Sequence, residues 1–227
     1  MKKLFVVLMT FPLILAALPA AAQQVAEGRL AQLYAPRPPA GSAFVRVINP
    51  GANTLKVGIA NGSDQVIGAS ARATRYAIVE GGKPFEVRVD GRVHSHPQVA
   101  AGSFTSLVLD ANSAERPWKD LNDGAASSDA LKAQIRFYNL APACGQGQLA
   151  LAGNGPVVFS AVPAGSSSIR AINPVRAQLV PSCDGKAGAA FELPALQPGD
   201  HYSLFLVAEK GMPVLRGQLS GTDAVRR

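Results

Sequence analysis

The strand-like motif FVRVIN at residues 44–49 recurs ninety residues later as QIRFYN at 134–139. Two further pairs of similar segments follow in the same order: LKVGIANG (55–62) with QLALAGNG (148–155), and AGSFTSLVL (101–109) with PGDHYSLFL (198–206). Three matches in one order predict two tandem domains of similar fold, even though each match is short.

The repeated segments have the periodicity of β-strands. Apolar residues recur at every second position over short runs that end at Gly, Asn or Asp, which is typical of sandwiches and barrels. The chain also holds 22 glycines and 17 prolines, a composition that favours strands and turns over long helices. We therefore predict an all-β fold of two tandem small β-sandwich domains joined by a polar linker.

The chain begins with the pattern of a cleavable signal peptide. Lys2 and Lys3 precede an apolar run over 4–18, and Ala20-Ala21-Ala22 fits the small-residue cleavage pattern. We expect cleavage after Ala22 and export, with an uncleaved anchor as the alternative. The predicted parts are a signal peptide (1–22), an extended or helical segment (23–41), the first sandwich (42–112), a linker (113–130), the second sandwich (131–220) and a tail (221–227).

Two features of this organisation make local predictions. The polar linker is expected to contain one helical turn near Trp118 to Leu121. The two cysteines, Cys144 and Cys183, form an even pair in an exported chain, which predicts a structural disulfide. Neither has the CxxC spacing or nearby histidines of a metal or redox site.

The arginines inside the repeated strands are candidates for binding. In FVRVIN, Val45 and Val47 are expected to face the core, which leaves Arg46 on the outer face. In QIRFYN the same alternation leaves Arg136 and Tyr138 outside. A cation on an exposed strand can discourage edge-to-edge aggregation. It can equally form a docking surface, since arginine and tyrosine are enriched at interfaces.

A third motif, SSIRAINPVRAQL (167–179), carries two more arginines around Asn173-Pro174. Pro174 indicates an edge strand or a bend, because proline cannot donate to a central ladder. The candidate partner- or polysaccharide-binding residues are thus Arg46, Asn49, Arg136, Tyr138, Asn139, Arg170, Asn173 and Arg176.

The net charge limits the class of partner. The full chain carries +7, and removing the two lysines of the signal peptide leaves +5. This balance suits an anionic polymer or membrane surface. The basic residues are scattered and the chain is exported, so we expect no nucleic acid partner.

No catalytic constellation is visible in the sequence. GxSxG is absent, and the acids are few and dispersed. His94 and His96 could share a strand face, but they lack an assured third metal ligand, and His201 is expected in a turn. We predict no catalytic residue, metal or cofactor. The open alternative is an acetyl carrier that uses Ser63, Ser106 or Ser203.

Two blocks, LYAPRPPAGSAFVRVINPG (33–51) and SIRAINPVRAQL (168–179), resemble the alginate biosynthesis protein family AlgF, which includes relatives from cellulose-acetylating systems. Cys144 and Cys183 lie outside this family pattern. The resemblance implies a periplasmic two-domain sandwich protein needed for O-acetylation of an exopolysaccharide, alginate first and cellulose second.

The same resemblance implies a non-catalytic adaptor. Its partners would be periplasmic SGNH-type O-acetyltransferases and a membrane-bound O-acyltransferase complex. The alternative is a carbohydrate-binding module that holds an anionic polysaccharide directly.

Overall fold

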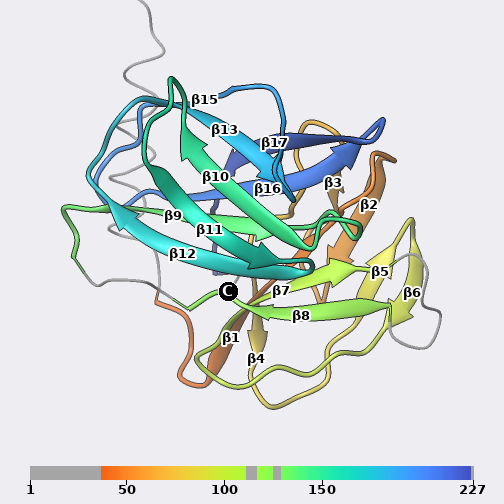
Figure 1. The fold of residues 1–227 in the computed structure, drawn as a ribbon. Helices are drawn as coiled ribbons and strands as arrows, with labels where there is room; N and C mark the ends of the chain where they lie inside the picture. The colour runs from red at the N-terminus through yellow and green to blue at the C-terminus, as the bar shows by residue number, and fades with distance from the viewer. Residues whose placement is uncertain (1–36, 111–116, 125–128, 226–227) are drawn as a thin grey trace, which may run out of the picture. The chain divides into compact units, whose positions relative to one another are not determined.

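The computed structural model describes residues 37–110, 117–124 and 129–225. In this part of the chain every element of regular secondary structure is a β-strand (Figure 1). The 17 strands form four sheets, which confirms the predicted all-β fold. Among the same residues no helix is long and apolar enough to cross a membrane. The predicted signal peptide and most of the segment 23–41 lie outside the described residues.

We call the first eight strands the first module. They are β1 (Ser42–Ile48), β2 (Leu55–Ile59), β3 (Gln65–Ile67), β4 (Ala77–Glu80), β5 (Val87–Val89), β6 (Arg92–Ser95), β7 (Phe104–Leu109) and β8 (Trp118–Asn122). They form two sheets, with strand orders β4-β1-β7-β8 and β3-β2-β5-β6. Within the first sheet, β1 and β7 are parallel, and the other pairs are antiparallel.

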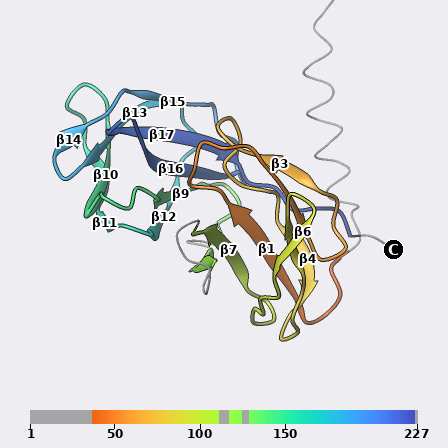
Figure 2. The same cartoon turned by 90° about the vertical axis from the view of Figure 1, so that its right-hand side faces the viewer.

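The remaining nine strands form the second module. They are β9 (Ala133–Asn139), β10 (Gln146–Leu151), β11 (Val157–Pro163), β12 (Ser166–Ile172), β13 (Ala177–Cys183), β14 (Lys186–Ala187), β15 (Phe191–Leu193), β16 (His201–Glu209) and β17 (Met212–Leu219). Their sheets have the orders β12-β9-β16-β17 and β11-β10-β13-β14, with β15 paired to β13 (Figure 2).

The two modules share one topology. Replacing β1 to β6 by β9 to β14, and β7 and β8 by β16 and β17, converts the strand orders of the first module into those of the second. The parallel pair of β1 with β7 recurs as β9 with β16. The sequence repeat therefore corresponds to a structural duplication.

Each module has its own hydrophobic core. Val45 and Val47 are fully buried in the core of the first module, and Ile135 and Phe137 in that of the second, as the alternation predicted. These strands thus direct their core-facing residues between the two sheets of their own module.

A third apolar cluster is built from both modules. It consists of Ile48, Ala73, Val108, Tyr138, Leu140, Phe205 and Val207. Ile48 and Val108 come from β1 and β7, whereas Phe205 and Val207 come from β16, so the outer faces of these strands are covered. Residues Pro38–Arg227 accordingly group into one compact unit. We call the region where the modules meet the junction.

The segment predicted as a linker contributes to the first module. Trp118–Asn122 forms β8, paired with β7, and not the helical turn that was expected. Trp118 packs against the first core and Leu121 against the junction cluster. A strand can use both of its faces in this way, because successive side chains point to opposite sides.

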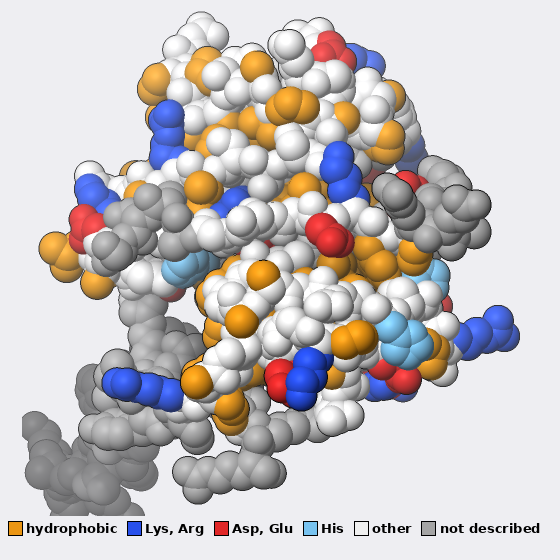
Figure 3. Space-filling view, turned by 90° about the horizontal axis from the view of Figure 1, so that it is seen from below, with side chains coloured by type: hydrophobic (Ala, Val, Ile, Leu, Met, Phe, Trp, Pro, Cys, Tyr) orange, Lys and Arg blue, Asp and Glu red, His pale blue; other side chains and the backbone are white. Residues whose placement is uncertain are grey.

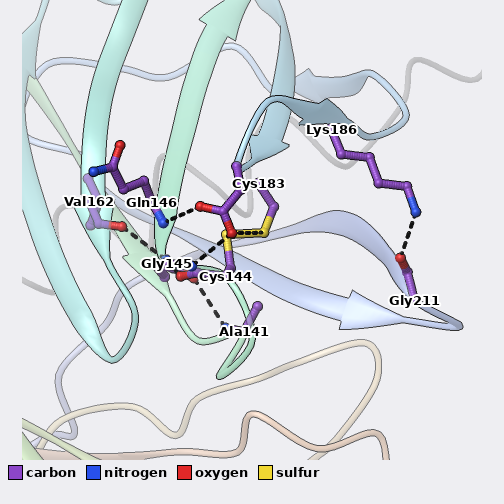
Figure 4. Close-up of a disulfide and its surroundings, with 10 residues drawn as sticks. Ala141, Cys144, Gly145, Gln146, Val162, Cys183, Lys186 and Gly211 are labelled. Atoms are coloured by element: carbon purple, nitrogen blue, oxygen red, sulfur yellow. Dashed lines mark hydrogen bonds between the residues drawn. A yellow bond between two sulfur atoms is a disulfide. The ribbon is translucent and has the colours of Figure 1, made fainter.

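The disulfide between Cys144 and Cys183 is present, with a Cα–Cα distance of 5.3 Å (Figure 4). It ties the turn after β9 to the end of β13. Beside it, the Asp184 carboxylate accepts the backbone N–H groups of Gly145 and Gln146 at 3.0 and 2.8 Å. The cross-link therefore lies entirely within the second module.

Candidate functional site

The two strand arginines occupy equivalent positions. Arg46 of β1 lies opposite Ser106 of β7, and Arg136 of β9 lies opposite Ser203 of β16. All four residues point away from the core of their own module, toward the junction. The repeated motif therefore places the same cation–hydroxyl pair on the outer face of both sheets.

Arg46 is the centre of a buried polar network. Its side chain is 1% exposed. Nε donates to Ser106 Oγ at 2.7 Å, Nη1 donates to Ser220 Oγ at 3.1 Å, and Nη2 donates to the hydroxyl of Tyr138. The guanidinium carbon also lies 4.7 Å from the ring centroid of Tyr76, within the range of a cation–π contact.

Asp123, in the segment just after β8, accepts hydrogen bonds from both modules. The hydroxyl of Tyr76 donates to Oδ2 at 2.7 Å, and that of Tyr138 donates to Oδ1 at 2.6 Å. Ser106 Oγ donates to Oδ2 as well. A carboxylate with this many donors is well compensated for its burial.

The same carboxylate pairs with both arginines. Arg46 Nε lies 3.6 Å from Oδ2 and Arg136 Nε 3.5 Å from Oδ1. Arg136 also donates to the backbone carbonyls of Asn122 and Gly124, on either side of Asp123. One carboxylate therefore joins a strand of the first module to a strand of the second.

Protonation states in the network follow from the surroundings. Burial alone would lower the pKa of Arg46, but the neighbouring Tyr138 and Tyr76 hydroxyls and the Asp123 carboxylate outweigh it and raise that pKa. Burial, with Asp123 adding to it, raises the pKa of Tyr138 to about 12 and raises that of Tyr76 too. At neutral pH the arginine is therefore charged and both tyrosines are hydrogen-bond donors.

The network is organised to hold the modules together. Ser106 and Ser203 are buried, and their hydrogen bonds go to Arg46, Asp123 and Ser220 rather than to a histidine base. His201, at the start of β16, has its pKa lowered by burial and by the Arg136 cation. We find no arrangement here that would activate a serine as a nucleophile.

A second ionic contact crosses the junction. Buried Arg72 of the first module pairs with Glu209 at the end of β16 at 2.9 Å. Arg216 of β17 pairs with the same carboxylate at 2.7 Å. The hydrogen bond from Arg216 and the charges of both arginines lower the pKa of Glu209. Burial lowers the pKa of Arg72, and Arg216 adds to this effect.

Backbone groups are bridged across the junction as well. The side-chain amide of Gln218 accepts from the N–H of Ala73 and donates to its carbonyl, both at 2.9 Å. Beyond β17, Gly221 and Asp223 hydrogen-bond to the two backbone groups of Tyr76 at 2.8 Å each. The first residues of the predicted tail 221–227 are thus paired with the first module.

The expected outward, accessible position of Arg46 and Tyr138 is wrong. Tyr138 is 0% exposed and Arg46 is 1% exposed, because the other module covers the faces that carry them. Arg136 keeps 11% of its side chain exposed. Period-two alternation identifies the face that a residue occupies, but not what packs against that face.

Asn49 and Asn139 are also buried, at equivalent positions after β1 and at the end of β9. Asn49 Oδ1 accepts the N–H of Gly51 at 2.9 Å, and Asn139 Oδ1 accepts the N–H of Ala141 at 3.3 Å. Each asparagine thus shapes the turn that follows its strand, which explains why the repeat retains it.

The other three candidates are exposed. Arg170 lies on β12, and Asn173 and Arg176 lie in the loop that follows it. Lys132 Nζ donates to Asn173 Oδ1. Pro174 sits in this loop, after the end of an edge strand, as its lack of an N–H predicted. These residues keep their predicted role as candidates for binding.

Sequence reasoning missed Asp123, Tyr76 and Ser220 as partners of the arginines. Asp123 follows another acid, Asp120, in a polar segment, so nothing in the sequence singles it out, and Ser220 is 174 positions from Arg46. The one usable indication was the strand arginine itself, because a buried cation requires a carboxylate nearby.

Groups of metal-ligand type do not form a usable site in the described residues. Ligand atoms of Cys144, Cys183 and Asp184 lie within 4.8 Å of one another, but both sulfurs are in the disulfide. His94 and His96 are exposed, and the ring of His94 contacts Trp118 edge-on at 5.2 Å. On the face in Figure 3, Lys and Arg side chains lie apart rather than in one patch.

Comparisons with known proteins give the family. Among solved structures, the chain is similar to the C-terminal domain of AlgF from P. aeruginosa, at 24% identity and a TM-score of 0.34, covering 39% of this chain and 98% of that one. It is also similar to CBMbc (family CBM26) from Eubacterium rectale Amy13K in complex with maltoheptaose, at 8% identity and a TM-score of 0.26, covering 77% and 95%. No curated protein matches.

A family model described as alginate O-acetyl transferase AlgF matches residues 13–203, which is most of the chain. The match spans the strands of both modules up to the start of β16 and includes Arg46, Asp123 and Arg136. The chain therefore belongs to the AlgF family, whose members are involved in the O-acetylation of alginate.

Proposed function

We propose that this protein is a non-catalytic periplasmic adaptor of exopolysaccharide O-acetylation. It holds components of the acetyltransferase machinery, with SGNH-type O-acetyltransferases and a membrane-bound O-acyltransferase complex as its partners. Alginate is the polymer that the family favours, and cellulose is the alternative substrate of the system.

The observation that supports this proposal is the junction. An adaptor acts by presenting surfaces at a fixed separation, so its modules must not swing freely. Here the Asp123 carboxylate, the Arg72–Glu209 pair and the bridged backbone of Ala73 all connect the two modules. Apolar packing around Tyr138 and Phe205 adds to them. Such a connection favours one rigid body over two domains on a tether.

The chemistry of the buried groups supports a non-catalytic role. The hydroxyls of Ser106, Ser203 and Ser220 are engaged with one another, with Arg46 or with Asp123. Acyl transfer requires a nucleophile that is activated by a base and accessible to its substrate. These serines meet neither requirement.

A capture experiment tests the adaptor. The mature protein is immobilised and offered the soluble SGNH-type acetyltransferase components, one at a time, with bound material measured by interferometry. We expect saturable binding of at least one component. Absence of binding to every component, including detergent-solubilised membrane O-acyltransferase, would refute the proposal.

A second measurement tests the lack of catalysis. The protein alone is incubated with an activated acetyl ester and polymannuronate, and both the protein and the polymer are examined by mass spectrometry. We expect neither an acetylated serine nor acetylated sugar. An acetyl group on Ser63, Ser106 or Ser203 would instead support the carrier alternative.

A further inference from the structure

We propose that the edge strand β4 and an aromatic pair beside it form the docking site for an extended segment of an acetyltransferase component. The site is made by Ile78 of β4, Phe44 of β1 and Phe104 of β7. We call these three residues the β4 patch. The inference rests on the proposed function, to which it adds a surface and the kind of segment that this surface fits.

The β4 patch is an apolar row on the outer face of the first module. Phe44 lies opposite Ile78 on one side and opposite Phe104 on the other, in the sheet β4-β1-β7-β8. The rings of Phe44 and Phe104 stack with 4.2 Å between their centroids, and Phe104 meets the Tyr76 ring edge-on at 5.4 Å. Phe104 nevertheless stays 36% exposed. The junction therefore covers the neighbouring row around Arg46 and leaves this row partly accessible.

The duplication shows that the fold does not require this aromatic pair. The positions equivalent to Phe44 and Phe104 in the second module are Gln134 and His201, which lie opposite each other in the same parallel pairing. Aromatic side chains are enriched in protein–protein interfaces, where they often act as anchors. The pair is therefore better explained by a partner than by the needs of the sheet.

β4 also offers backbone groups for strand pairing. The N–H of Phe44 donates to the carbonyl of Ser103, on the β7 side. The Phe44–Ile78 pair is therefore not hydrogen-bonded, and Ile78 directs its N–H and C=O away from β1. Since β4 is the last strand of its sheet, no strand of the described chain takes up these groups.

An extended segment already occupies the start of this edge. Thr222, beyond β17, forms a parallel bridge with Tyr76. The N–H of Tyr76 donates to Gly221, and its C=O accepts from Asp223, at 2.8 Å each. A partner strand can continue this pairing at Ile78, two residues further along β4. Its alternate side chains would then extend the β4 patch by an apolar residue.

The charges at the sheet edges favour the addition of a strand to β4. The opposite edge of the same sheet, β8, carries Lys119 and Asp120, and such charges discourage pairing with another strand. β4 has the sequence AIVE, with no charge before Glu80, its last residue. The segment that fits is therefore extended and apolar at alternate positions, as in other cases of β-strand addition.

A second copy of this chain fits the edge less well than an unlike partner. Twofold pairing centred on Ile78 would bring Glu80 of one copy against Tyr76 of the other, whose backbone groups are already occupied. Twofold pairing centred on Glu80 would place two carboxylates directly opposite each other, which is destabilising. An unlike segment meets neither obstacle, which favours an acetyltransferase component as the occupant.

Capture by interferometry tests the site, with the mature protein and one acetyltransferase component at a time. The first test variant combines Phe44→Gln and Phe104→His, the residues that the second module carries at these positions. The second, Ile78→Pro, removes the outward N–H and keeps the ladder to β1. The control combines Val66→Gln and Val93→Gln, at residues that are 65% and 52% exposed on the other sheet of the same module.

We expect each test variant to bind the captured component at least about tenfold more weakly than wild type, which corresponds to about 1.4 kcal/mol. The control should stay within about twofold, since substitutions away from the centre of an interface are nearly neutral. Thermal unfolding checks that all three variants are folded. A photoreactive p-benzoylphenylalanine in place of Phe104 should cross-link to the same component, and one in place of Val93 should not.

The outcomes separate this inference from the proposed function. Capture by wild type that either test variant retains, or that the control loses equally, would overturn the docking site and leave the adaptor standing. The same holds for weakening without a cross-link from position 104, or for a cross-link to lipid or to a second copy of the chain. If wild type captured no component at all, the adaptor proposal would fail, and this inference with it.

Discussion

Arg46 and Arg136, which stand at the same position of the two repeats, approach opposite oxygens of one buried carboxylate. Their Nε atoms lie 3.6 and 3.5 Å from Oδ2 and Oδ1 of Asp123. The duplication therefore supplies two equivalent cations, and the segment between the modules supplies one anion. We regard this shared carboxylate as the main polar connection of the junction.

Replacing Asp123 by Asn should destabilise the protein strongly. The amide leaves the buried guanidinium of Arg46 without a counter-charge and offers N–H groups to hydroxyl donors. Breaking a buried ion pair by removing one partner costs about 3–5 kcal/mol. Urea denaturation of the mature protein measures the change in the free energy of unfolding.

The control for this variant is Asp64→Asn. Asp64 pairs with Lys56 at 3.1 Å, but both side chains are substantially exposed. An exposed pair contributes about 0–1 kcal/mol, so this variant should remain close to wild type. Similar losses in both variants would contradict a special role of Asp123.

A matched pair of arginine variants tests the burial of the repeat motif. Arg46→Gln should lower the free energy of unfolding by about 3 kcal/mol or more, because the buried Asp123 carboxylate then keeps only the partly exposed Arg136 as its ionic partner. Arg170→Gln, on the exposed edge strand, should change it by at most about 0.5 kcal/mol. If Arg46→Gln were tolerated as well as Arg170→Gln, the outward, accessible position predicted from the sequence would be correct after all.

The sequence predicted what depends on local pattern. Period two identified Val45 and Val47 as core residues, and the ordered repeats predicted the tandem sandwiches. The even pair of cysteines predicted the disulfide. Each of these inferences needs only neighbouring residues or a simple count.

What the sequence did not reveal depends on how the modules pack. The outer faces of β1 and β9 look like exposed surface in the sequence, because an arginine interrupts each of them. Their burial becomes evident only once Asp123, Tyr76 and Ser220 are placed beside them, and these residues are far from the motif in the chain. The segment Trp118–Asn122 was wrongly predicted as a helical turn for a related reason. Its two apolar residues pack against two different clusters, Trp118 against the first core and Leu121 against the junction cluster.

Removing the disulfide should weaken the second module in particular. Cys144 and Cys183 are 39 positions apart, and closing a loop of that length stabilises by about 2–4 kcal/mol in the chain-entropy description. The variant with both cysteines changed to Ser should lose about that much in thermal or urea unfolding.

Hydrogen exchange locates the effect of that change. Protection should fall in β10 and β13, which adjoin the cross-link, and stay high in β1 and β7 of the first module. Adding reductant to wild type should reproduce the result, and reductant should not alter the Cys-to-Ser variant further. Unchanged stability would contradict a structural role for the cross-link.

Stability should fall at alkaline pH, and Tyr138 should account for part of that fall. Burial first, and the Asp123 carboxylate in addition, raise the pKa of Tyr138 to about 12, against the opposing charge of Arg46. In the unfolded chain a tyrosine titrates near pH 10. The folded state therefore keeps a proton that the unfolded state loses.

The sign follows from this difference in proton affinity. Below about pH 10 both states hold the proton and the contribution is complete. As pH rises from about 10 to about 12, the unfolded state gains by ionising, and the free energy of unfolding declines on account of Tyr138, by an amount on the order of 3 kcal/mol. Tyr76, whose pKa burial also raises, adds to the decline.

Urea denaturation at a series of pH values between about 9 and 11 measures this slope. Tyr138→Phe is the matched variant, since it keeps the ring in the junction cluster and removes only the hydroxyl. It should be less stable than wild type at pH 9, but should lose stability more slowly as the pH rises. Parallel curves for the two proteins would show that Tyr138 titrates alike in the folded and unfolded states, and that the enclosed network described around Arg46 is not formed in solution.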